Sequence, residues 1–579
     1  MGIPSYFSYI VKNHPEILER YCRDNVGSAG SVNVHNLYLD CNSIIYDAFY
    51  NLTEEEIGID TNDTKITNLL IHHTISKITQ YISIISPSET VMVSFDGVAP
   101  VAKLEQQRTR RFKSWFQTMV SSKLGTKGEK GAKVVPWSTT AITPGTAFMD
   151  QLNREITNHF STTTIPGVSA KVIVSTSAEV GEGEHKIFHH IRTCAKHLTQ
   201  NTVIYGLDAD LIMLAVNHLP LCGNIYLFRE TPEFIKSIDS SLEPNEHYLF
   251  HISILATNIV LDMQQATRFT DQDKHRRLHD YIFLCFLLGN DFLPHFPSVN
   301  IRTGGIDKLL QHYKHSIGQN GQKKPKFLIC DGKIVWKNFR LLIASLAECE
   351  HEYLKKEHDM RNVRERRYLS GKMRRTDTKT TNTLDKQEQQ EQQEQQEQQE
   401  QQEQLDRFQS IPCFERDVEK HIDPHKDGWE HRYYTTLLGI EPTPDRIHQL
   451  CANYLEGLEW THAYYNADCP DWRWSYRYHY PPLLTDLLKH IPYFDTQFIA
   501  PNNHVAVVPN VQLCYVLPHH NLSLLPAELC SLLRTKYAAF YPENADFEWS
   551  YCRYFWESHV KLPSLDIGLL EAAVVSVVS

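Results

Sequence analysis

Short β-branched segments alternate with helical patterns over the first two hundred residues, and this alternation constrains the fold more than any other feature. NLYLD (36–40), TVMVSFD (90–96), AKVIVST (170–176) and NTVIYGL (201–207) are separated by segments whose apolar residues recur every three or four positions. Parallel strands need long crossover connections, which are usually helices. The pattern therefore predicts an α/β core over residues 1–375, with a mixed, mainly parallel sheet flanked by helices.

A Gln/Glu repeat divides the chain. It offers almost no apolar side chain to bury, so we expect residues 376–411 to form a solvated linker. Residues 355–375, just before it, are charged along their length, which favours an exposed helix over a core element or an RNA contact. Residues 412–579 are rich in Trp and Tyr. We expect this second segment to fold and to pack on the core.

Composition excludes several classes of protein. The 13 cysteines include no CxxC pair, which argues against zinc sites and disulfide frameworks. No apolar run approaches the ~20 residues that span a bilayer, and the first ten residues lack the pattern of a signal peptide. We expect a cytoplasmic protein, with the nucleus as the alternative. The net charge of −11 argues against a general nucleic-acid coat but can hide a local basic patch.

Acidic residues recur where the predicted strands end. The carboxyl ends of strands in an open α/β sheet meet at one edge, where ligands bind. Glycine-flanked acids in GEGE precede a predicted helix, and a further Asp follows the apolar run in LLGND. Seven candidate residues result: Asp40, Asp96, Glu182, Glu184, Asp208, Asp210 and Asp291.

Such a cluster needs positive charge, because two like charges ~4 Å apart repel by about 4 kcal/mol at an effective dielectric of 20. Carboxylates without Cys or His select hard cations, so Mg²⁺ or Mn²⁺ is implied. Two such ions ~4 Å apart are suited to phosphodiester cleavage. The alternative is that each acid is a helix cap or an ion-pair partner, but the recurrent placement at strand ends favours metal.

A basic helix is predicted directly after Asp96. Residues 101–136 contain nine Lys or Arg against two Glu. Lys103, Gln107, Arg110 and Arg111 share one helical face, since they are spaced at i, i+4, i+7 and i+8. Such donors suit a terminal phosphate, which offers more oxygens than an internal phosphodiester. A solvated charged helix is the alternative, but the position next to Asp96 favours substrate binding.

The chain resembles the Xrn-type 5′→3′ exoribonucleases over almost its whole length. The motifs that carry this resemblance follow the family's order: MGIPSYFSYI, LYLDCNSIIY, FDGVAPVAKLEQQRTRRF, ITPGT, GEGEHK, YGLDADLIML, FLLGNDFLPHFPSVNIR and, past the repeat, EGLEWTHAYY and WRWSYRYHYPP. The resemblance implies a PIN/FEN-like nuclease core. It also implies a monomer that degrades single-stranded RNA bearing a 5′ monophosphate, processively, to nucleoside 5′-monophosphates.

Site residues follow from the same resemblance. The seven acids would hold divalent metal, and Lys103, Gln107, Arg110 and Arg111 would hold the 5′ phosphate. Tyr46 stands where the family typically has a base-stacking histidine, and tyrosine can also stack. The aromatic residue that closes the stack is expected to be Trp460, with Trp472 and Trp474 as competitors. The proline usual before GEGE is missing after Val180.

Two rival functions differ from this expectation. A flap-type structure-specific nuclease would share the acid cluster, but the aromatic second segment and the phosphate face argue against it. A non-catalytic RNA-binding scaffold would be favoured by the loss of one of the seven acids, and none is lost.

Overall fold

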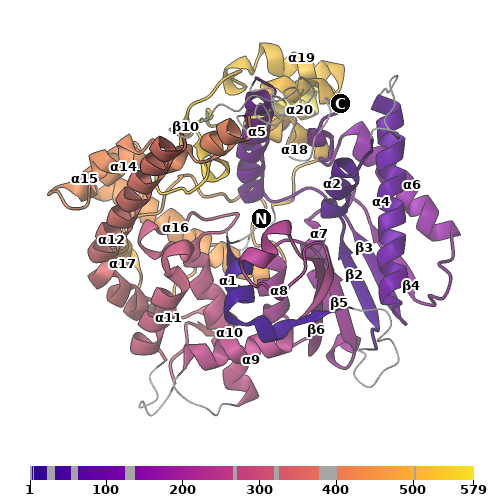
Figure 1. The fold of residues 1–579 in the computed structure, drawn as a ribbon, viewed down its shortest axis with the longest axis horizontal. Coiled ribbons are helices and arrows are strands. Elements are labelled where there is room, and N and C mark those ends of the chain that lie inside the picture. The colour runs from indigo at the N-terminus through magenta and orange to yellow at the C-terminus, as the bar shows by residue number, and fades with distance from the viewer. Residues whose placement is uncertain are drawn as a thin grey trace, which may run out of the picture.

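The computed structural model describes residues 3, 5–21, 33–53, 56, 63–123, 137–264, 270–318, 325–376, 401–500, 502 and 504–578. Figure 1 shows a strand-rich half, a helical half and a C-terminal group of helices beside α5. The helices are α1 (Tyr6–Asn13), α2 (Asn42–Tyr50), α4 (Asp63–Ile85), α5 (Val101–Lys123), α6 (Ala147–Thr162), α7 (Gly183–Thr193), α8 (Asp210–Asn217), α9 (Ile252–Met263), α10 (Asp271–Cys285), α11 (Gly305–Ser316), α12 (Trp336–Thr376), α14 (Asp417–Ile422), α15 (Trp429–Arg432), α16 (Pro444–Asn466), α17 (Leu484–His490), α18 (Pro509–Val516), α19 (Ala527–Thr535) and α20 (Ile567–Val578).

A mixed, mainly parallel sheet forms the core, as predicted, and the structure gives it seven strands. Its order is β1-β7-β6-β5-β2-β3-β4. The five strands from β6 to β4 are parallel to one another, β7 is antiparallel to β6, and β1 is antiparallel to β7. The strands are β1 (Leu18–Arg20), β2 (Asn36–Asp40), β3 (Thr90–Ser94), β4 (Lys171–Ser175), β5 (Asn201–Tyr205), β6 (Asn224–Glu230) and β7 (His247–His251). The pairs β8 (Ile329–Cys330) with β9 (Lys333–Ile334), and β10 (Phe547–Glu548) with β11 (His559–Val560), lie outside it.

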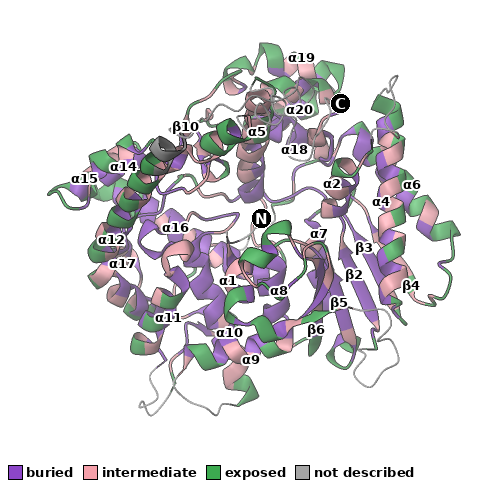
Figure 2. Ribbon diagram, in the orientation of Figure 1, coloured by how far each residue is buried: buried purple, intermediate pink, exposed green. Residues whose placement is uncertain are grey.

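Helices cover both faces of the sheet, and Figure 2 shows its central strands buried. Leu37 and Leu39 of β2 pack in one apolar cluster with α2, α4 and α6. Tyr38, between them, belongs to a second cluster with α1, α7, α8 and α9. This alternation follows from the two-residue period of a strand. Because both faces are covered, polar residues can gather only at the strand ends.

The linker predicted for residues 376–411 extends too far downstream. Residues 401–409 are helical, Leu405 is buried, and the ring of Phe408 lies 4.4 Å from that of Phe555. A few apolar residues after the repeat therefore suffice to order this end on the C-terminal segment. Residues 377–400, which hold most of the repeat, lie outside the described residues.

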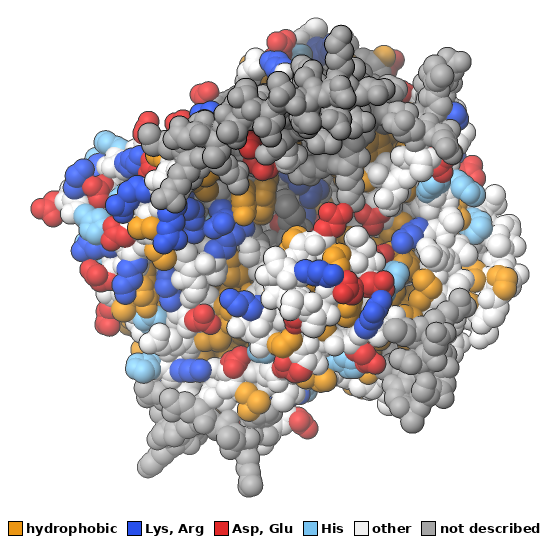
Figure 3. Space-filling model, in the orientation of Figure 1, with side chains coloured by type: hydrophobic (Ala, Val, Ile, Leu, Met, Phe, Trp, Pro, Cys, Tyr) orange, Lys and Arg blue, Asp and Glu red, His pale blue; other side chains and the backbone are white. Residues whose placement is uncertain are grey.

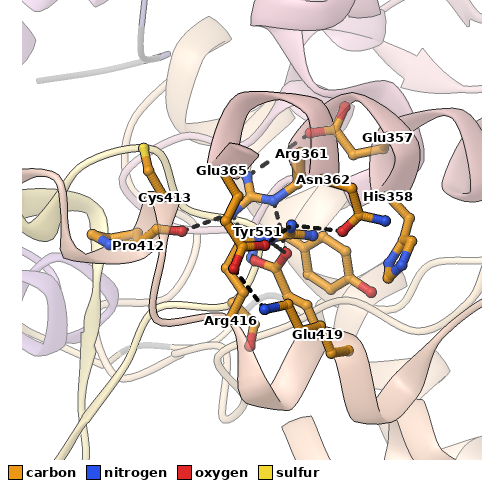
Figure 4. Close-up of polar contacts among 12 residues, drawn as sticks. Glu357, His358, Arg361, Asn362, Glu365, Pro412, Cys413, Arg416, Glu419 and Tyr551 are labelled. Atoms are coloured by element: carbon orange, nitrogen blue, oxygen red, sulfur yellow. Dashed lines mark hydrogen bonds and ion pairs between the residues drawn. The ribbon is translucent and has the colours of Figure 1, made fainter. Parts of the chain in front are cut away.

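Helix α12 is partly buried, whereas the sequence predicted an exposed helix for residues 355–375. Glu357 and Arg361 are buried, and Arg361 donates to Glu419 of α14 at 2.8 and 2.6 Å. Arg416 donates to the same carboxylate at 2.6 Å, as does the backbone N–H of Tyr551 at 2.8 Å (Figure 4). This ion cluster joins segments on both sides of the repeat, and its pairing explains why charged residues are tolerated in the interior.

Deleting residues 385–400 is expected to leave the thermal unfolding midpoint within about 1 °C, because a Gln/Glu repeat has nothing to bury and surface changes are worth about 0.5 kcal/mol or less. RNA turnover should also stay within about twofold. Thermal scans and degradation rates of the deletion variant test this. A control that instead removes residues 401–409 should lose stability, and equal losses in both variants would contradict the assignment.

Candidate active site

The seven predicted acids lie at the carboxyl edge of the parallel strands or next to it. Asp40 ends β2, Asp96 lies two residues past β3, and Asp208 lies between β5 and α8. Asp210 begins α8, Glu182 directly precedes α7 and Glu184 lies in the first turn of α7. Asp291 follows the turn after α10. The chain thus delivers carboxylates from several elements to one region.

The GEGE loop packs against the carboxyl ends of β2 and β3. The backbone N–H of Gly183 donates to Asp96 Oδ1 at 2.7 Å. A Cβ atom at Gly183 would lie 2.5 Å from Asp40 Oδ1, so only glycine allows this approach. Asn42 donates to Asp96 Oδ2 at 2.6 Å and accepts from the Asp96 backbone N–H at 3.1 Å. The sequence analysis missed Asn42, although its position two residues after Asp40 was a signal.

Lys103 of α5 lies inside the acid cluster. Its Nζ contacts Asp291 and lies 2.8 Å from Glu182 Oε1. Burial acts to lower the pKa of Lys103, but the charges of Asp291 and Glu182 outweigh it and raise that pKa, so the ammonium stays charged. The predicted phosphate face thereby reaches the predicted metal site, and Lys103 supplies positive charge to two of its acids.

Two further residues complete this part of the site and were not predicted. Gln106 donates to Asp291 Oδ1 at 2.8 Å. Tyr464, from α16 in the second segment, donates to Glu182 Oε2 at 2.9 Å and stacks on His185 at 4.4 Å. Gln106 is adjacent to a predicted residue, whereas nothing in the pattern around Tyr464 distinguished it from other core aromatics. The second segment therefore contributes directly to the acid cluster.

The carboxylates repel one another. Burial raises the pKa of Asp40, and the charges of Asp96, Asp208 and Glu182 raise it further. Burial and then the charge of Asp210 do the same for the pKa of Glu184. The pKa of Asp210 rises to about 7, first through burial and then through Asp291. These mutual effects mean that the acids share one electrostatic site.

Among the seven acids, three buried carboxylate oxygens have no hydrogen-bond partner within the described residues: Asp40 Oδ1, Glu184 Oε2 and Asp210 Oδ1. Unpartnered buried carboxylate oxygens suit a hard divalent cation. Within the described ranges, no group of three or more His, Cys, Asp or Glu side chains already has the arrangement of a metal site. The donor set fits such an ion chemically, and the assignment of the seven acids as metal ligands stays a prediction.

The remaining predicted phosphate ligands lie along α5. Gln107 is buried, and among the described residues its Oε1 has no hydrogen-bond partner. Arg111 donates to Thr143 Oγ1 of the ITPGT motif at 2.5 Å, and its Nε has no partner in the part of the chain that the structure describes. Burial lowers the pKa of Arg111 to about 10, with Tyr46 acting to raise it and Arg110 to lower it. Tyr46 and Arg110 therefore lie near the guanidinium of Arg111, which is partly desolvated.

Trp460 does not have the free ring face that base stacking requires. It is fully buried, its Nε1 donates to the backbone oxygen of Asp471 at 2.8 Å, and it stacks between Tyr464 and Trp474. Trp472 is only half-buried, and its backbone oxygen accepts from Val101 at the start of α5, at 3.1 Å. The prediction that Trp460 stacks on the terminal base is corrected, because packing against other aromatic residues of the core buries its ring.

Across the part of the chain that the structure describes, no helix is long and apolar enough to cross a membrane.

Acids at the carboxyl edge of a parallel sheet, with a basic helix reaching into them, define the class of PIN-like α/β nucleases. Residues 1–231 match the family model described as the XRN 5′-3′ exonuclease N-terminus, and residues 271–579 match the Xrn1 helical domain. The chain belongs to the Xrn family of 5′-3′ exonucleases, which confirms the resemblance seen in its motifs.

Curated relatives support the same family. The chain is 26% identical to 5′-3′ exoribonuclease 2 of Debaryomyces hansenii, over 99% of this chain and 69% of the relative. It is 26% identical to 5′-3′ exoribonuclease 2 of Arabidopsis thaliana, over 99% of this chain and 67% of the relative. It is 27% identical to 5′-3′ exoribonuclease 1 of Saccharomyces cerevisiae, over 98% of this chain but only 42% of the relative. Nucleases of this family generally depend on a divalent metal.

Proposed function

We propose that the chain is a processive 5′→3′ exoribonuclease that degrades RNA with a 5′ monophosphate to nucleoside 5′-monophosphates. The observation that carries the proposal is the contact of Lys103 with Asp291 and Glu182. It joins a basic helical face, suited to a terminal phosphate, to an acid cluster suited to divalent cations. An RNA 5′ end bound to the basic face would present its first phosphodiester to the acid cluster.

The acid cluster would hold two Mg²⁺ or Mn²⁺ ions. When bound, such ions activate a water and stabilise the leaving oxygen. The unpartnered oxygens of Asp40, Glu184 and Asp210 support this assignment. Asn42, Gln106 and Tyr464 act as positioning residues, because each donates to one of the proposed ligands and fixes its carboxylate.

End selection would lie with Gln107, Arg110 and Arg111. Two guanidinium groups can bind the oxygens of a terminal phosphate through charge-assisted hydrogen bonds. Tyr46, which is partly buried near Arg111, would stack on the terminal base, and Trp472 is the better-placed partner from the second segment. We expect these partly buried residues to exclude a capped or triphosphorylated end, which brings more bulk and charge, as the resemblance to the family implies.

The part of the RNA that lies outside the active site would run along α12. Figure 3 shows Lys and Arg side chains gathered on the side of the molecule where α12 and α14 lie. Lys356, Arg366 and Arg367 of α12 are exposed. Exposed cations attract a phosphodiester backbone without reading its sequence, which suits an enzyme that removes any nucleotide in turn.

The rival functions have less support. Tyr464 of the second segment donates to Glu182, so that segment is built into the site rather than appended to it. This favours the exoribonuclease over a flap-type nuclease. A scaffold without activity would not need seven acids whose charges repel one another in one cluster.

Two RNAs of equal sequence, one with a 5′ monophosphate and one with a 5′ triphosphate, test the proposal. We expect the first to be degraded at least about a hundredfold faster, since a misplaced terminal phosphate would forfeit contacts worth about 3 kcal/mol or more. The products should be nucleoside 5′-monophosphates, and EDTA should stop the reaction. Oligonucleotide products, or equal rates on both RNAs, would overturn it.

A further inference from the structure

The ITPGT motif (residues 142–146) forms the loop between the short helix η3 (Thr139–Ala141) and α6. Thr143 of this loop is fully buried. Its Oγ1 lies 2.5 Å from Nη2 of Arg111 on α5 and 2.7 Å from the backbone oxygen of Thr140. The loop therefore contacts one of the residues proposed to bind the 5′ phosphate.

The two hydrogen bonds of Thr143 have a fixed direction. A guanidinium can only donate, so Thr143 accepts from Arg111 through a lone pair of its hydroxyl oxygen. The single proton of that hydroxyl then goes to the backbone oxygen of Thr140. Because this backbone contact orients the lone pairs of Thr143, the position of the loop sets the direction in which Arg111 is held.

The loop itself is anchored at two further points. Thr146 caps α6, because its Oγ1 accepts from the backbone N–H of Met149 at 3.3 Å. Gly145 has a φ of +93°, and a Cβ atom there would lie 3.1 Å from Cβ of Pro509 in the second segment, so glycine is needed at this contact. Thr143 is thus an acceptor on a loop that is held by α6 and by the second segment.

Arg111 keeps donors for a ligand. Among the described residues its side chain hydrogen-bonds only to Thr143, and its buried Nε has no partner there. Burial lowers the pKa of Arg111, and Asp96 is one of the groups whose charge acts to raise it, so the guanidinium lies near the acid cluster. A guanidinium binds phosphate through two parallel N–H donors, which requires that its plane face the phosphate oxygens. A hydrogen bond that fixes this plane therefore matters for phosphate binding.

We infer that Thr143 is a positioning residue that orients Arg111 towards the terminal phosphate and thereby sets the preference for a phosphorylated 5′ end. The inference rests on the proposed function, which supplies the phosphate. The alternative is that Thr143 only holds its own loop together. The two roles differ in their consequences. Loss of an orienting hydroxyl slows the reaction only on RNA with a 5′ phosphate, whereas loss of a merely structural hydroxyl affects all RNA substrates alike.

Thr143→Val, which removes the hydroxyl and keeps the branched shape, tests the inference through single-turnover rates on 5′-monophosphate and 5′-hydroxyl RNA of equal sequence. On the 5′-monophosphate RNA the rate should fall about tenfold or more, as expected for one hydrogen bond to a charged group. On the 5′-hydroxyl RNA the change should be about twofold or less, because no terminal phosphate is bound. Thr143→Ser keeps the hydroxyl and should retain the wild-type preference.

Thr146→Val is the matched control, since Thr146 belongs to the same motif and is buried, but its hydroxyl caps α6. This variant should unfold at a lower temperature, because a helix cap is lost, and should keep the ratio of the two rates. Thermal unfolding also checks Thr143→Val. If that variant does not fold, Thr143→Cys replaces it, because a thiol is a weak hydrogen-bond acceptor.

A double-mutant cycle with Arg111→Ala shows whether Thr143 acts through Arg111. In the Arg111→Ala background, Thr143→Val should cause no further loss on 5′-monophosphate RNA, because the group that it orients is gone. The same loss in both backgrounds, or a wild-type preference that survives Thr143→Val, would overturn the inference and leave the proposed function standing. A wild-type enzyme that degrades both RNAs at the same rate would overturn the proposed end selection together with the inference.

Discussion

Asp210→Asn is expected to lower the single-turnover rate of RNA degradation by about a thousandfold, which corresponds to about 4 kcal/mol of lost transition-state stabilisation. The amide is a poorer ligand for a hard cation than the carboxylate it replaces. The fold should survive, because Asp210 is buried near Asp291 and one of its oxygens has no hydrogen-bond partner, so removing its charge also relieves repulsion.

Glu179→Gln is the matched control for this variant. Glu179 follows β4 at the same edge of the sheet, but it is exposed and accepts a hydrogen bond from Ser175 outside the acid cluster. Its rate should stay within about twofold of wild type, as surface substitutions usually allow. An Asp210→Asn enzyme with wild-type turnover in Mg²⁺ would refute the assignment of Asp210 as a metal ligand.

Glu419→Gln is expected to lower the free energy of unfolding by about 3 kcal/mol, since it removes the carboxylate that buried Arg361 and Arg416 share and leaves them only Glu357 at 3.9 Å and Glu365 at 3.2 Å. Denaturant unfolding with an unchanged m value measures this loss. The exposed neighbour Glu415 provides the control, and Glu415→Gln should change stability by less than about 0.5 kcal/mol. Equal effects of the two substitutions would mean that the ion cluster does not hold the segments together.

The same cluster predicts a pH dependence. Burial acts to raise the pKa of Glu419, but the charges of Arg361 and Arg416 outweigh it and hold that pKa below the ordinary value of 4.5. Its contribution to stability is therefore complete above pH 4.5 and is lost as the pH falls below that value towards the lower pKa of the folded state. Wild type should lose more stability than Glu419→Gln over this range.

Local pattern was sufficient to predict the sheet and the acids at its edge. The strand segments are rich in apolar residues, as strands buried on both faces are, Asp40 is the last residue of β2, and Asp208 comes three residues after β5. The helical spacing of α5 likewise placed Lys103 and Arg111 on one face. These features depend on neighbours in sequence, so a single chain is enough to reveal them.

Features that depend on distant contacts could not be predicted. Trp460 and Trp472 look alike in sequence, and only the packing of α16 decides that the first is buried and the second is half-buried. Arg361 lies in a charged run and appears solvated until Glu419, 58 residues away, is placed beside it. Residues 401–409 border a repeat that dominates their composition, although Phe408 anchors them.

Selection of the RNA end tests the central claim most directly, through single-turnover rates of wild type and of Arg110→Ala/Arg111→Ala on 5′-monophosphate and 5′-hydroxyl RNA at two salt concentrations. If the α5 face reads a terminal phosphate beside the acid cluster, the double variant should lose at least about a hundredfold on the 5′-monophosphate RNA, because each charge-assisted contact is worth about 1.5–3 kcal/mol. On the 5′-hydroxyl RNA, which never made those contacts, the change should be about twofold or less. Lys123→Ala, an exposed change at the end of the same helix, should affect neither rate. Equal losses on both RNAs, with a salt dependence that weakens in the double variant, would contradict the account and mean that α5 attracts RNA without reading its end.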